Sequence, residues 1–306
     1  MKKSIGIILL SMMLVLSLAA CQSTENSGSY AGSSASQTTA PSVTSTDKSD
    51  TSTVVNSAPI TVISREDGSG TRGAFTELFG VLDSDKVDQT TNRAEITNST
   101  SVMMTSVAGN PDAIGYISLG SLNSTVKAAK VDGAEASVAN INSGTYTISR
   151  PFNIATKDDV SALAQDFIGF IMSADGQDIV EAAGYIRVED TGAYNGTKPS
   201  GKIVVGGSSS VSPVMEKLTE GYMAINTGAD IELQTSDSST GMNNTIDGVC
   251  DIGMASRDLK DSEHDAGLND ITLAMDGIAV IVNNNSPIDN LTKEQVKQIF
   301  TGEITN

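Results

Sequence analysis

The stretch Val62-Ile63-Ser64-Arg65-Glu66-Asp67-Gly68-Ser69-Gly70-Thr71-Arg72 connects an apolar run to a helix-like pattern through a turn of small residues. Its β-branched residues predict a strand over 60–64, and the apolar spacing after the turn predicts a helix over 71–82. The first N–H groups of such a helix lack intrahelical partners and carry the positive end of the helix dipole. The turn is therefore a candidate site for a small anion.

Two further strand-to-helix junctions share this chemistry, namely Gly206-Gly207-Ser208-Ser209-Ser210 and Ser236-Asp237-Ser238-Ser239-Thr240-Gly241. Ser and Gly are ordinary capping residues at any one junction, so the prediction rests on the three occurring together. Arg65 would add a planar, positively charged guanidinium to the site. The hydroxyl groups that would add donors are those of Ser69, Thr71, Ser209, Ser210 and Ser238.

Asp67 lies two residues after Arg65, and on an extended backbone such positions share a face. Two roles stay open for it, bracing the guanidinium of Arg65 or accepting a proton from the ligand. Gly68, Gly70 and Gly73 also satisfy the spacing of a dinucleotide-binding turn. The acidic residue expected roughly twenty positions later would be Asp88, which lies in a polar run rather than at the end of a strand. This spacing therefore does not favour a dinucleotide.

Short apolar runs alternate with helical patterns through the rest of the chain, which indicates an α/β fold. The expected strands cover 60–64, 114–118, 126–131, 147–155, 202–206, 231–235, 251–255 and 278–283. The expected helices cover 71–82, 100–108, 160–172, 175–183, 212–225, 240–247 and 292–300. Residues 190–201, rich in Gly, Asn, Thr, Lys and Pro, are expected to be a surface linker between segments 59–189 and 202–306.

Composition narrows the range of functions. The 306 residues include 37 Asp and Glu against 19 Lys and Arg, a net charge of -18, which argues against a nucleic-acid partner. The single histidine, His264, lies in a polar run, so histidine-dependent catalysis is not expected. The sequence shows no metal-ligand cluster and no cofactor motif, and Cys250 is expected to be a buried, unreactive thiol.

The N-terminal residues have the pattern of an export signal. Lys2 and Lys3 precede an apolar run over 5–18, which is shorter than the roughly 20 residues that span a bilayer. Leu18-Ala19-Ala20-Cys21 resembles the bacterial lipoprotein signal, which implies a signal peptide over 1–20 and a lipid anchor on Cys21; an uncleaved membrane anchor is the alternative. Ser and Thr make up 18 of the 36 residues from Gln22 to Ser57, so 21–58 is expected to be a flexible tether. Either way the chain is expected at the extracytoplasmic face of the cell membrane.

Residues Val62 to Arg72 closely resemble the phosphate-contacting segment of phosphate-binding lipoproteins of ABC importers, the PstS-type substrate-binding proteins. Val204 to Pro213 resembles the opening strand and first binding turn of that family. Ser238 to Gly241 resembles its second turn, and Asp251 to Arg257 resembles the segment after its third strand. The resemblance covers nearly all of 59–306 and implies a type II periplasmic-binding-protein-like fold, with two α/β lobes closing on a ligand cleft between them.

The resemblance also implies the ligand contacts. Carried over residue by residue, they are Arg65, Ser69, Gly70, Thr71, Ser209, Ser210 and Ser238, with Asp67 holding Arg65. Some family members place an Asp near the position of Ser256 to accept the proton of monohydrogen phosphate, but this chain has Ser256-Arg257. The acceptor is then expected at Asp237 or Asp67, and Arg257 either adds a second positive contact or is a surface arginine.

The order of the two segments departs from the family. There the stretch resembling 202–306 comes first and the stretch resembling 59–189 follows, so this chain resembles a circular permutation. A truncated tandem chain and an error of sequence assembly are the alternatives. The segment before Pro59 and the segment ending at Asn306 are expected in the same lobe, which should be the less stable one.

These observations predict an extracytoplasmic solute-binding protein that captures inorganic phosphate for the membrane permease of an ABC importer. We expect no enzymatic activity and no cofactor. Two alternatives remain at this point. One is a phosphoryl-transfer enzyme that uses the same anion site, which turnover of phosphate monoesters would reveal. The other is a permuted fragment with a signalling or structural role, which would show no stabilisation by a ligand.

Overall fold

The computed structural model of this chain describes residues 58–306. The predicted signal peptide over 1–20, the predicted lipidation site Cys21 and almost all of the predicted tether over 21–58 lie outside the described residues. Within residues 58–306, no helix combines the length and the apolar character needed to cross a membrane.

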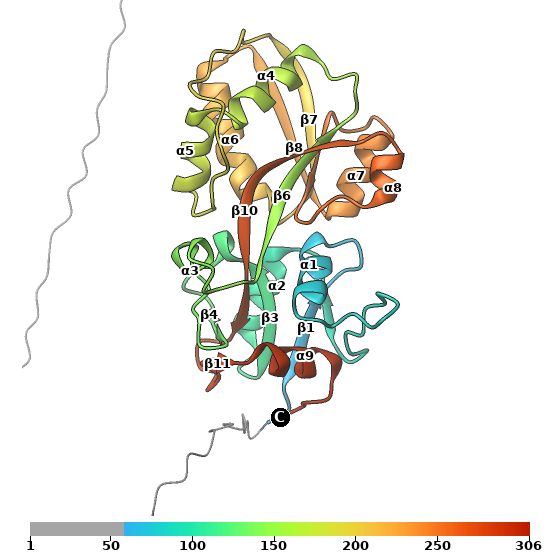
Figure 1. Cartoon of the computed structure of the whole chain (residues 1–306), viewed down its shortest axis with the longest axis vertical. Helices are drawn as coiled ribbons and strands as arrows, with labels where there is room; N and C mark the ends of the chain where they lie inside the picture. Colours follow the sequence, from blue (N-terminus) through green and yellow to red (C-terminus); the bar gives the residue numbers. More distant parts are fainter. Residues whose placement is uncertain (1–57) are drawn as a thin grey trace, which may run out of the picture. The chain divides into compact units, whose positions relative to one another are not determined.

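Residues 58–306 form two α/β lobes joined by two long strands, as expected from the sequence (Figure 1). The joining strands are β6 (Ser149–Thr156) and β10 (Asn269–Val282). The lobe drawn above contains β7 (Gly201–Ser208), β8 (Ala229–Ser236), β9 (Ile252–Ala255), α4 (Ala162–Ile171), α5 (Ala174–Ala182), α6 (Ser212–Ile225), α7 (Ser238–Ile246) and α8 (Asp261–Asp265). We call it the upper lobe.

The lower lobe surrounds the other end of the joining strands (Figure 1). Its strands are β1 (Thr61–Arg65), β2 (Glu95–Thr97), β3 (Ala113–Ser118), β4 (Lys127–Ala128), β5 (Lys130–Val131) and β11 (Asn290–Leu291). Its helices are α1 (Gly70–Leu78), α2 (Thr100–Gly109), α3 (Val138–Asn142) and α9 (Lys293–Thr301), with a short 3-10 turn over Leu119–Ser121.

One sheet runs through both lobes in the order β2-β1-β3-β10-β6-β9-β7-β8. The strands β1, β2 and β3 are parallel in the lower lobe, and β7, β8 and β9 are parallel in the upper lobe. The strand β10 pairs antiparallel with β3 through Ile278–Val282 and with β6 through Asn269–Gly277. The parallel strands of both lobes lead into helices, so the helix N-termini of the two lobes can converge where the lobes meet.

Each lobe has its own hydrophobic core. The upper core gathers Phe152, Phe167 and Tyr222 with aliphatic side chains of β7 and α6. In the lower core, Phe75 of α1 stacks on Tyr116 of β3 with ring centroids 3.9 Å apart. Burying such side chains is worth about 1.5–3 kcal/mol each. The two lobes are therefore separately packed bodies connected by β6 and β10.

The lobes do not coincide with the two sequence segments on either side of the expected linker. The helices α4 and α5 belong to 59–189 but pack in the upper lobe, while β11 and α9 belong to 202–306 and lie in the lower lobe. Ile60 N–H donates to the Thr305 carbonyl at 2.7 Å, so the first and last described segments lie side by side in the lower lobe, as expected.

Most expected elements are present, with some corrections. The strand expected over 278–283 is only the last part of β10, which begins at Asn269. Asp276-Gly277 has the composition of a turn, but in the structure these two residues pair with Ser149-Arg150 of β6 and continue the strand. The strand expected over 126–131 is two short strands, β4 and β5. Four short elements, none longer than five residues, were not expected from the sequence: β2, β11, α3 and α8.

Candidate functional site

The three predicted junctions come together where the lobes meet, each at a helix N-terminus. Ser69 caps α1 by accepting from Arg72 N–H, and Asp237 caps α7 by accepting from Thr240 N–H. The turn containing Ser209 and Ser210 leads from β7 into α6. A backbone hydrogen bond from Ser239 N–H to the Gly68 carbonyl, at 3.2 Å, joins the first turn to the third across the lobes.

A fourth helix N-terminus, which the sequence analysis did not include, reaches the same place. Thr100 is the first residue of α2, whose N-cap is Ser99. Its hydroxyl lies 3.0 Å from the Ser210 hydroxyl, and its N–H donates to Ser209 Oγ at 3.4 Å. The signal was available in the sequence, because Ser99-Thr100 forms another hydroxyl-bearing helix start after a short strand.

The hydroxyl groups at these junctions form one buried cluster. The Thr71 hydroxyl lies 2.8 Å from that of Ser210, and the Ser208 hydroxyl donates to Ser256 Oγ at 3.0 Å. Ser256 also lies 3.4 Å from the hydroxyls of Thr71 and Ser238. The members are Thr71, Thr100, Ser208, Ser209, Ser210, Ser238 and Ser256, each at most 8% exposed. The structure therefore brings together most of the predicted hydroxyl donors.

Arg65 reaches this cluster from the end of β1. Its guanidinium is buried, and Nη2 donates to Ser209 Oγ at 3.1 Å. Glu66 holds it in place by accepting from Nε at 2.8 Å and from Nη2 at 2.6 Å. The prediction that Arg65 contributes a positive charge at the junction of the lobes agrees with this geometry.

The prediction that Asp67 braces Arg65 is wrong. The side chain of Asp67 is 98% exposed and pairs with Arg72 Nη1 at 2.7 Å. The prediction assumed an extended backbone beyond Arg65, but β1 ends at Arg65 and the chain turns there, so Glu66 takes the bracing position. Arg72 also pairs with Asp88 at 2.7 Å, on the outside of the first turn.

The other two acidic or basic candidates have partners of their own. Asp237 uses both carboxylate oxygens to cap α7, accepting from the Thr240 N–H and hydroxyl. The guanidinium of Arg257 is paired with Glu263 at 2.7 Å and also donates to Ser239 Oγ at 3.3 Å. Burial alone would raise the pKa of Glu263, but hydrogen bonds from Arg257 and from the Lys260 N–H lower it overall.

Arg150 is a second buried guanidinium that sequence reasoning missed. It lies on β6, and its Nη1 donates to Thr71 Oγ1 at 3.0 Å and to the Ser256 carbonyl at 2.5 Å. Its Nη2 donates to Asp276 at 3.2 Å, and its buried Nε has no hydrogen-bond partner among residues 58–306. The available signal was that Arg150 is the single charged residue of the strand expected over 147–155.

The two carboxylates next to these guanidiniums set the local electrostatics. Burial lowers the pKa of Arg150 to about 10, with Asp276 opposing and Arg65 reinforcing the shift. Burial also raises the pKa of Asp276, although Arg150 and the Gly120 N–H oppose it. Each guanidinium thus pairs with one carboxylate and also donates to a hydroxyl of the cluster, Arg65 to Ser209 and Arg150 to Thr71.

Glycines allow the turns of the two lobes to approach closely. A Cβ added at Gly70 would lie 2.3 Å from Ser238 Oγ and 2.7 Å from Ser256 Oγ. A Cβ added at Gly68 would lie 2.2 Å from Asp237 Oδ1. The third glycine, Gly73, is different, because its nearest neighbour would be Arg257 Cδ at 3.9 Å. Of these three glycines, Gly68 and Gly70 are the ones that allow the first turn to approach the upper lobe.

The arrangement suits binding of a small oxyanion. Backbone N–H groups, hydroxyls and guanidiniums are donors, and helix N-termini favour negative charge. Within residues 58–306, no group of three His, Cys, Asp or Glu side chains is placed to hold a metal ion. The free thiol of Cys250 is buried beside β9, and burial raises its pKa, so it is not an activated nucleophile.

Comparison with known proteins agrees with this arrangement. The sequence matches the PBP superfamily domain over residues 36–175 and 192–306. It is 53% identical over 252 residues to the phosphate-binding protein PstS 2 of Streptococcus agalactiae serotype V, covering 81% of this chain and 86% of that protein. The chain belongs to the PstS family.

Other members of the PstS family match to different extents. A solved structure of the phosphate-binding protein of a phosphate ABC transporter from Streptococcus pneumoniae TIGR4 is 44% identical and has a TM-score of 0.64. That match covers 81% of this chain and 98% of the other. In contrast, the PstS of Bacillus subtilis matches over 111 residues at 34% identity, which is 36% of this chain and 37% of that protein.

Proposed function

We propose that this PstS-family chain binds inorganic phosphate where the lobes meet and delivers it to the membrane permease of an ABC importer. The observation that carries the proposal is the convergence of Arg65, Arg150 and a buried hydroxyl cluster at the N-termini of four described helices. Charge-assisted hydrogen bonds of this kind are the strongest available to a bound anion. The names of these relatives point to the same ligand.

Binding requires the anion to exchange water for protein donors. Those donors are supplied by both lobes, Arg65 and Thr71 from the lower and Ser210 and Ser238 from the upper, so the full set exists only when the lobes are together. The strands β6 and β10 are the connections about which the lobes would close. A closed state completed by the ligand accounts for capture, and reopening at the permease would release the anion.

The site favours binding over phosphoryl transfer. A nucleophilic hydroxyl needs a neighbouring base, but the carboxylates nearest to the cluster, Glu66 and Asp276, are engaged by arginines. His264, the single histidine of the sequence, lies in α8, where its Nδ1 is 3.3 Å from the Leu268 carbonyl and 4.0 Å from Asp270 Oδ1. The hydrogen bonds described for the hydroxyl cluster do not include it. We therefore propose a binding protein and not an enzyme.

The test is calorimetric titration of the full chain in detergent, after bound anion has been removed by partial unfolding and refolding. One phosphate per chain should bind, and phosphate monoesters should not be turned over. A folded chain that gives no heat with phosphate would contradict the proposal and favour the fragment with a signalling or structural role. Turnover of a monoester would favour the phosphoryl-transfer alternative.

We further propose that the chain is extracytoplasmic and anchored through lipid on Cys21. The support is the lipoprotein-like sequence Leu18-Ala19-Ala20-Cys21 and the similarity to the phosphate-binding protein of a phosphate ABC transporter from Streptococcus pneumoniae TIGR4. The Ser- and Thr-rich tether would hold the binding lobes away from the membrane. Cys21→Ser should release the protein into the medium of producing cells, whereas retention in the membrane would favour an uncleaved anchor.

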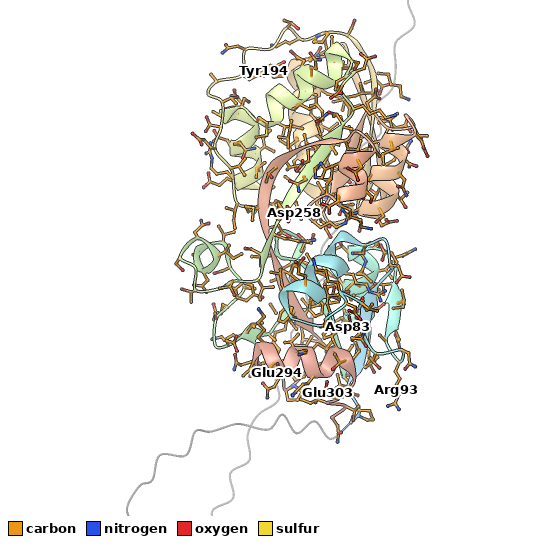
Figure 2. The ribbon with its side chains drawn as sticks, turned by 45° about the vertical axis from the view of Figure 1, so that its right-hand side comes forward. Asp83, Arg93, Tyr194, Asp258, Glu294 and Glu303 are labelled. Atoms are coloured by element: carbon orange, nitrogen blue, oxygen red, sulfur yellow. The ribbon has the colours of Figure 1, made fainter. Side chains whose placement is uncertain are left out.

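The order of the two segments is proposed to be a real property of the chain, with 190–201 as the connection. The support is the 252-residue match to the streptococcal relative, against a match of 111 residues to the Bacillus subtilis protein. Within 190–201, Tyr194 packs against Phe170 and Tyr222 and donates to Asp166, at the top of the upper lobe in Figure 2. Mass spectrometry of the natural protein would test this order. A proteolytic peptide that spans 190–201 should be found, and an intact mass larger than that of this sequence would favour a tandem chain.

A further inference from the structure

The two lobes are connected by a short two-stranded ribbon (Figure 1). Over residues 149–152 and 274–277, β6 and β10 pair with each other. Beyond this ribbon, β6 also pairs with β9 of the upper lobe from Asn153 onward, and β10 pairs with β3 of the lower lobe from Ile278 onward. A rotation of one lobe against the other must therefore bend the ribbon.

Tyr185 and Gly120 meet beside this ribbon, one from each lobe. Tyr185 follows α5 and is buried in the upper core, and the next residue, Ile186, exchanges two backbone hydrogen bonds with Met275 at 2.9 and 2.8 Å. Gly120 lies in the 3-10 turn after β3 and donates its N–H to Asp276 Oδ1 at 3.2 Å. Two neighbouring positions of β10 are thus attached to segments of different lobes, and these segments touch each other.

The contact between Tyr185 and Gly120 leaves no room for a side chain at Gly120. A Cβ added there would lie 2.3 Å from both Cε1 and Cζ of the Tyr185 ring. The φ angle of Gly120 lies outside the left-handed region, so its backbone conformation is open to other residues. The approach of the Tyr185 ring, and not the shape of the turn, therefore requires a glycine at this position.

The same contact gathers three buried hydroxyls that have no hydrogen-bond partner among residues 58–306. They belong to Tyr185 of the upper lobe and to Ser118 and Ser121 of the lower lobe. Burial raises the pKa of Tyr185, with Asp276 reinforcing this shift and Ser121 and Ser118 opposing it, so these groups lie within electrostatic range of one another. Hydroxyls in a permanently packed core are nearly always hydrogen-bonded. Three unpaired hydroxyls at one place indicate a contact that opens to water when the lobes separate.

A chain of hydrogen bonds connects this contact to the hydroxyl cluster. Gly120 donates to Asp276, Asp276 accepts from Arg150 Nη2 at 3.2 Å, and Arg150 Nη1 donates to Thr71 Oγ1 at 3.0 Å. A displacement of the Gly120 turn therefore moves the groups that orient the Arg150 guanidinium.

We propose that Tyr185 is a positioning residue for anion capture, because its ring, resting on Gly120, sets the angle at which the two lobes close. The inference rests on the proposed phosphate-binding function and adds the element that controls it. At the angle seen here, Thr71 of the lower lobe lies 2.8 Å from Ser210 of the upper lobe, so donors of both lobes reach the same anion. A wider angle would separate these donors and weaken binding without altering any of them.

The experiment is calorimetric titration of the full chain in detergent with inorganic phosphate. Gly120→Ala should weaken phosphate binding at least about tenfold, because the added methyl group displaces the Tyr185 ring and holds the lobes apart. Gly109→Ala is the matched control in the same lobe. A methyl group at Gly109, the last residue of α2, has no neighbour within 4 Å, so this variant should bind phosphate like the wild-type chain.

Substitutions of Tyr185 show whether its ring is the cause. Tyr185→Leu removes Cε1 and Cζ, so in this background Gly120→Ala should change phosphate affinity by less than about threefold. Tyr185→Phe keeps the ring, so in this background Gly120→Ala should still weaken binding at least about tenfold. A role of Gly120 in the turn alone would give the same loss in both backgrounds.

Each result has a distinct meaning. A Gly120→Ala chain that binds phosphate like the wild-type chain would overturn this inference and leave the proposed function intact, and so would equal losses in the Leu and Phe backgrounds. Failure of the folded wild-type chain to bind phosphate would overturn both. If Gly120→Ala does not fold, hydrogen exchange of the wild-type chain decides. Phosphate should slow exchange in the peptides that contain Gly120 and Ile186 and not in α9, at the far end of the lower lobe in Figure 1, whereas unchanged exchange in both peptides would overturn the inference.

Discussion

Arg150 lies directly opposite Asp276 on the two antiparallel strands that join the lobes, and its guanidinium donates to that carboxylate at 3.2 Å. The same guanidinium donates to Thr71 of the lower lobe and to the Ser256 carbonyl of the upper lobe. One side chain therefore contacts the connection between the lobes and both faces of the site. An anion that neutralises Arg150 would favour the arrangement in which these contacts exist together.

Replacing Arg150 by Met tests its role in both stability and binding. Removing one partner of a buried ion pair leaves the other charge uncompensated, which typically costs about 3–5 kcal/mol of unfolding free energy. Phosphate affinity should fall by about 1.5–3 kcal/mol in addition, because a charge-assisted contact is lost. Urea unfolding measures the first effect and calorimetric titration the second.

The double variant Arg150→Met with Asp276→Leu separates these effects. Replacing a buried ion pair by apolar side chains is often neutral, so most of the stability should return. Phosphate binding should stay weak. A double variant that binds phosphate like the wild-type chain would show that Arg150 has no contact with the anion.

Arg65→Met should weaken phosphate binding with little loss of stability. Glu66, the carboxylate it leaves behind, is 21% exposed and can be hydrated, unlike Asp276. The expected loss is about 1.5–3 kcal/mol, or roughly 10- to 150-fold in affinity. Arg187→Met is the control, because Arg187 pairs with Asp178 and Asp190 on the surface of the upper lobe. Equal affinities of the two variants would remove Arg65 from the site.

Two glycines of α1 provide a matched test of lobe closure. Gly70→Ala places a methyl group against Ser238 and Ser256, whereas the nearest atom to a methyl group at Gly73 is 3.9 Å away. Alanine should stabilise the helix by about 0.5–1 kcal/mol at Gly73, whereas at Gly70, the first residue of α1, the close approach to Ser238 opposes any such gain. Gly70→Ala should reduce phosphate affinity at least tenfold, about 1.4 kcal/mol, and Gly73→Ala should not. Similar affinities of the two variants would show that the lobes need not meet at Gly70.

Each junction that the sequence predicted is local in the chain. Arg65, Ser69, Gly70 and Thr71 lie within one strand, turn and helix, so hydrophobic period and capping chemistry place them together. The exception is Asp67, whose orientation depends on where the extended backbone ends. Because the extended backbone ends at Arg65, Glu66 and not Asp67 pairs with the Arg65 guanidinium.

The second guanidinium, which the sequence did not predict, depends on long-range pairing. Arg150 reaches the site because the register of β6 and β10 places it opposite Asp276, a residue 126 positions away. The dipeptide Asp276-Gly277 has the composition of a turn, so the sequence does not predict that β10 continues through it. The register between β6 and β10 therefore could not be predicted. The lobe in which α4, α5 and α9 pack is likewise decided by their contacts with the shared sheet. The local sequence of each helix does not predict these contacts.

The ion pair between Arg257 and Glu263 predicts an acid-dependent loss of stability. The pKa of Glu263 in the folded chain is lowered, so the stabilisation by its carboxylate is fully present above the unfolded-state pKa of about 4.3. The stabilisation is lost as the pH falls through the lower pKa of Glu263 in the folded chain.

Glu263→Gln should therefore lower the unfolding free energy by about 1–3 kcal/mol at neutral pH. The difference between the variant and the wild-type chain should shrink toward zero once the pH is below the folded-state pKa of Glu263. Urea unfolding across this pH range measures it, with Glu216→Gln, an exposed site on α6, as the control. A difference that is independent of pH would show that the carboxylate of Glu263 acts by packing and not by charge.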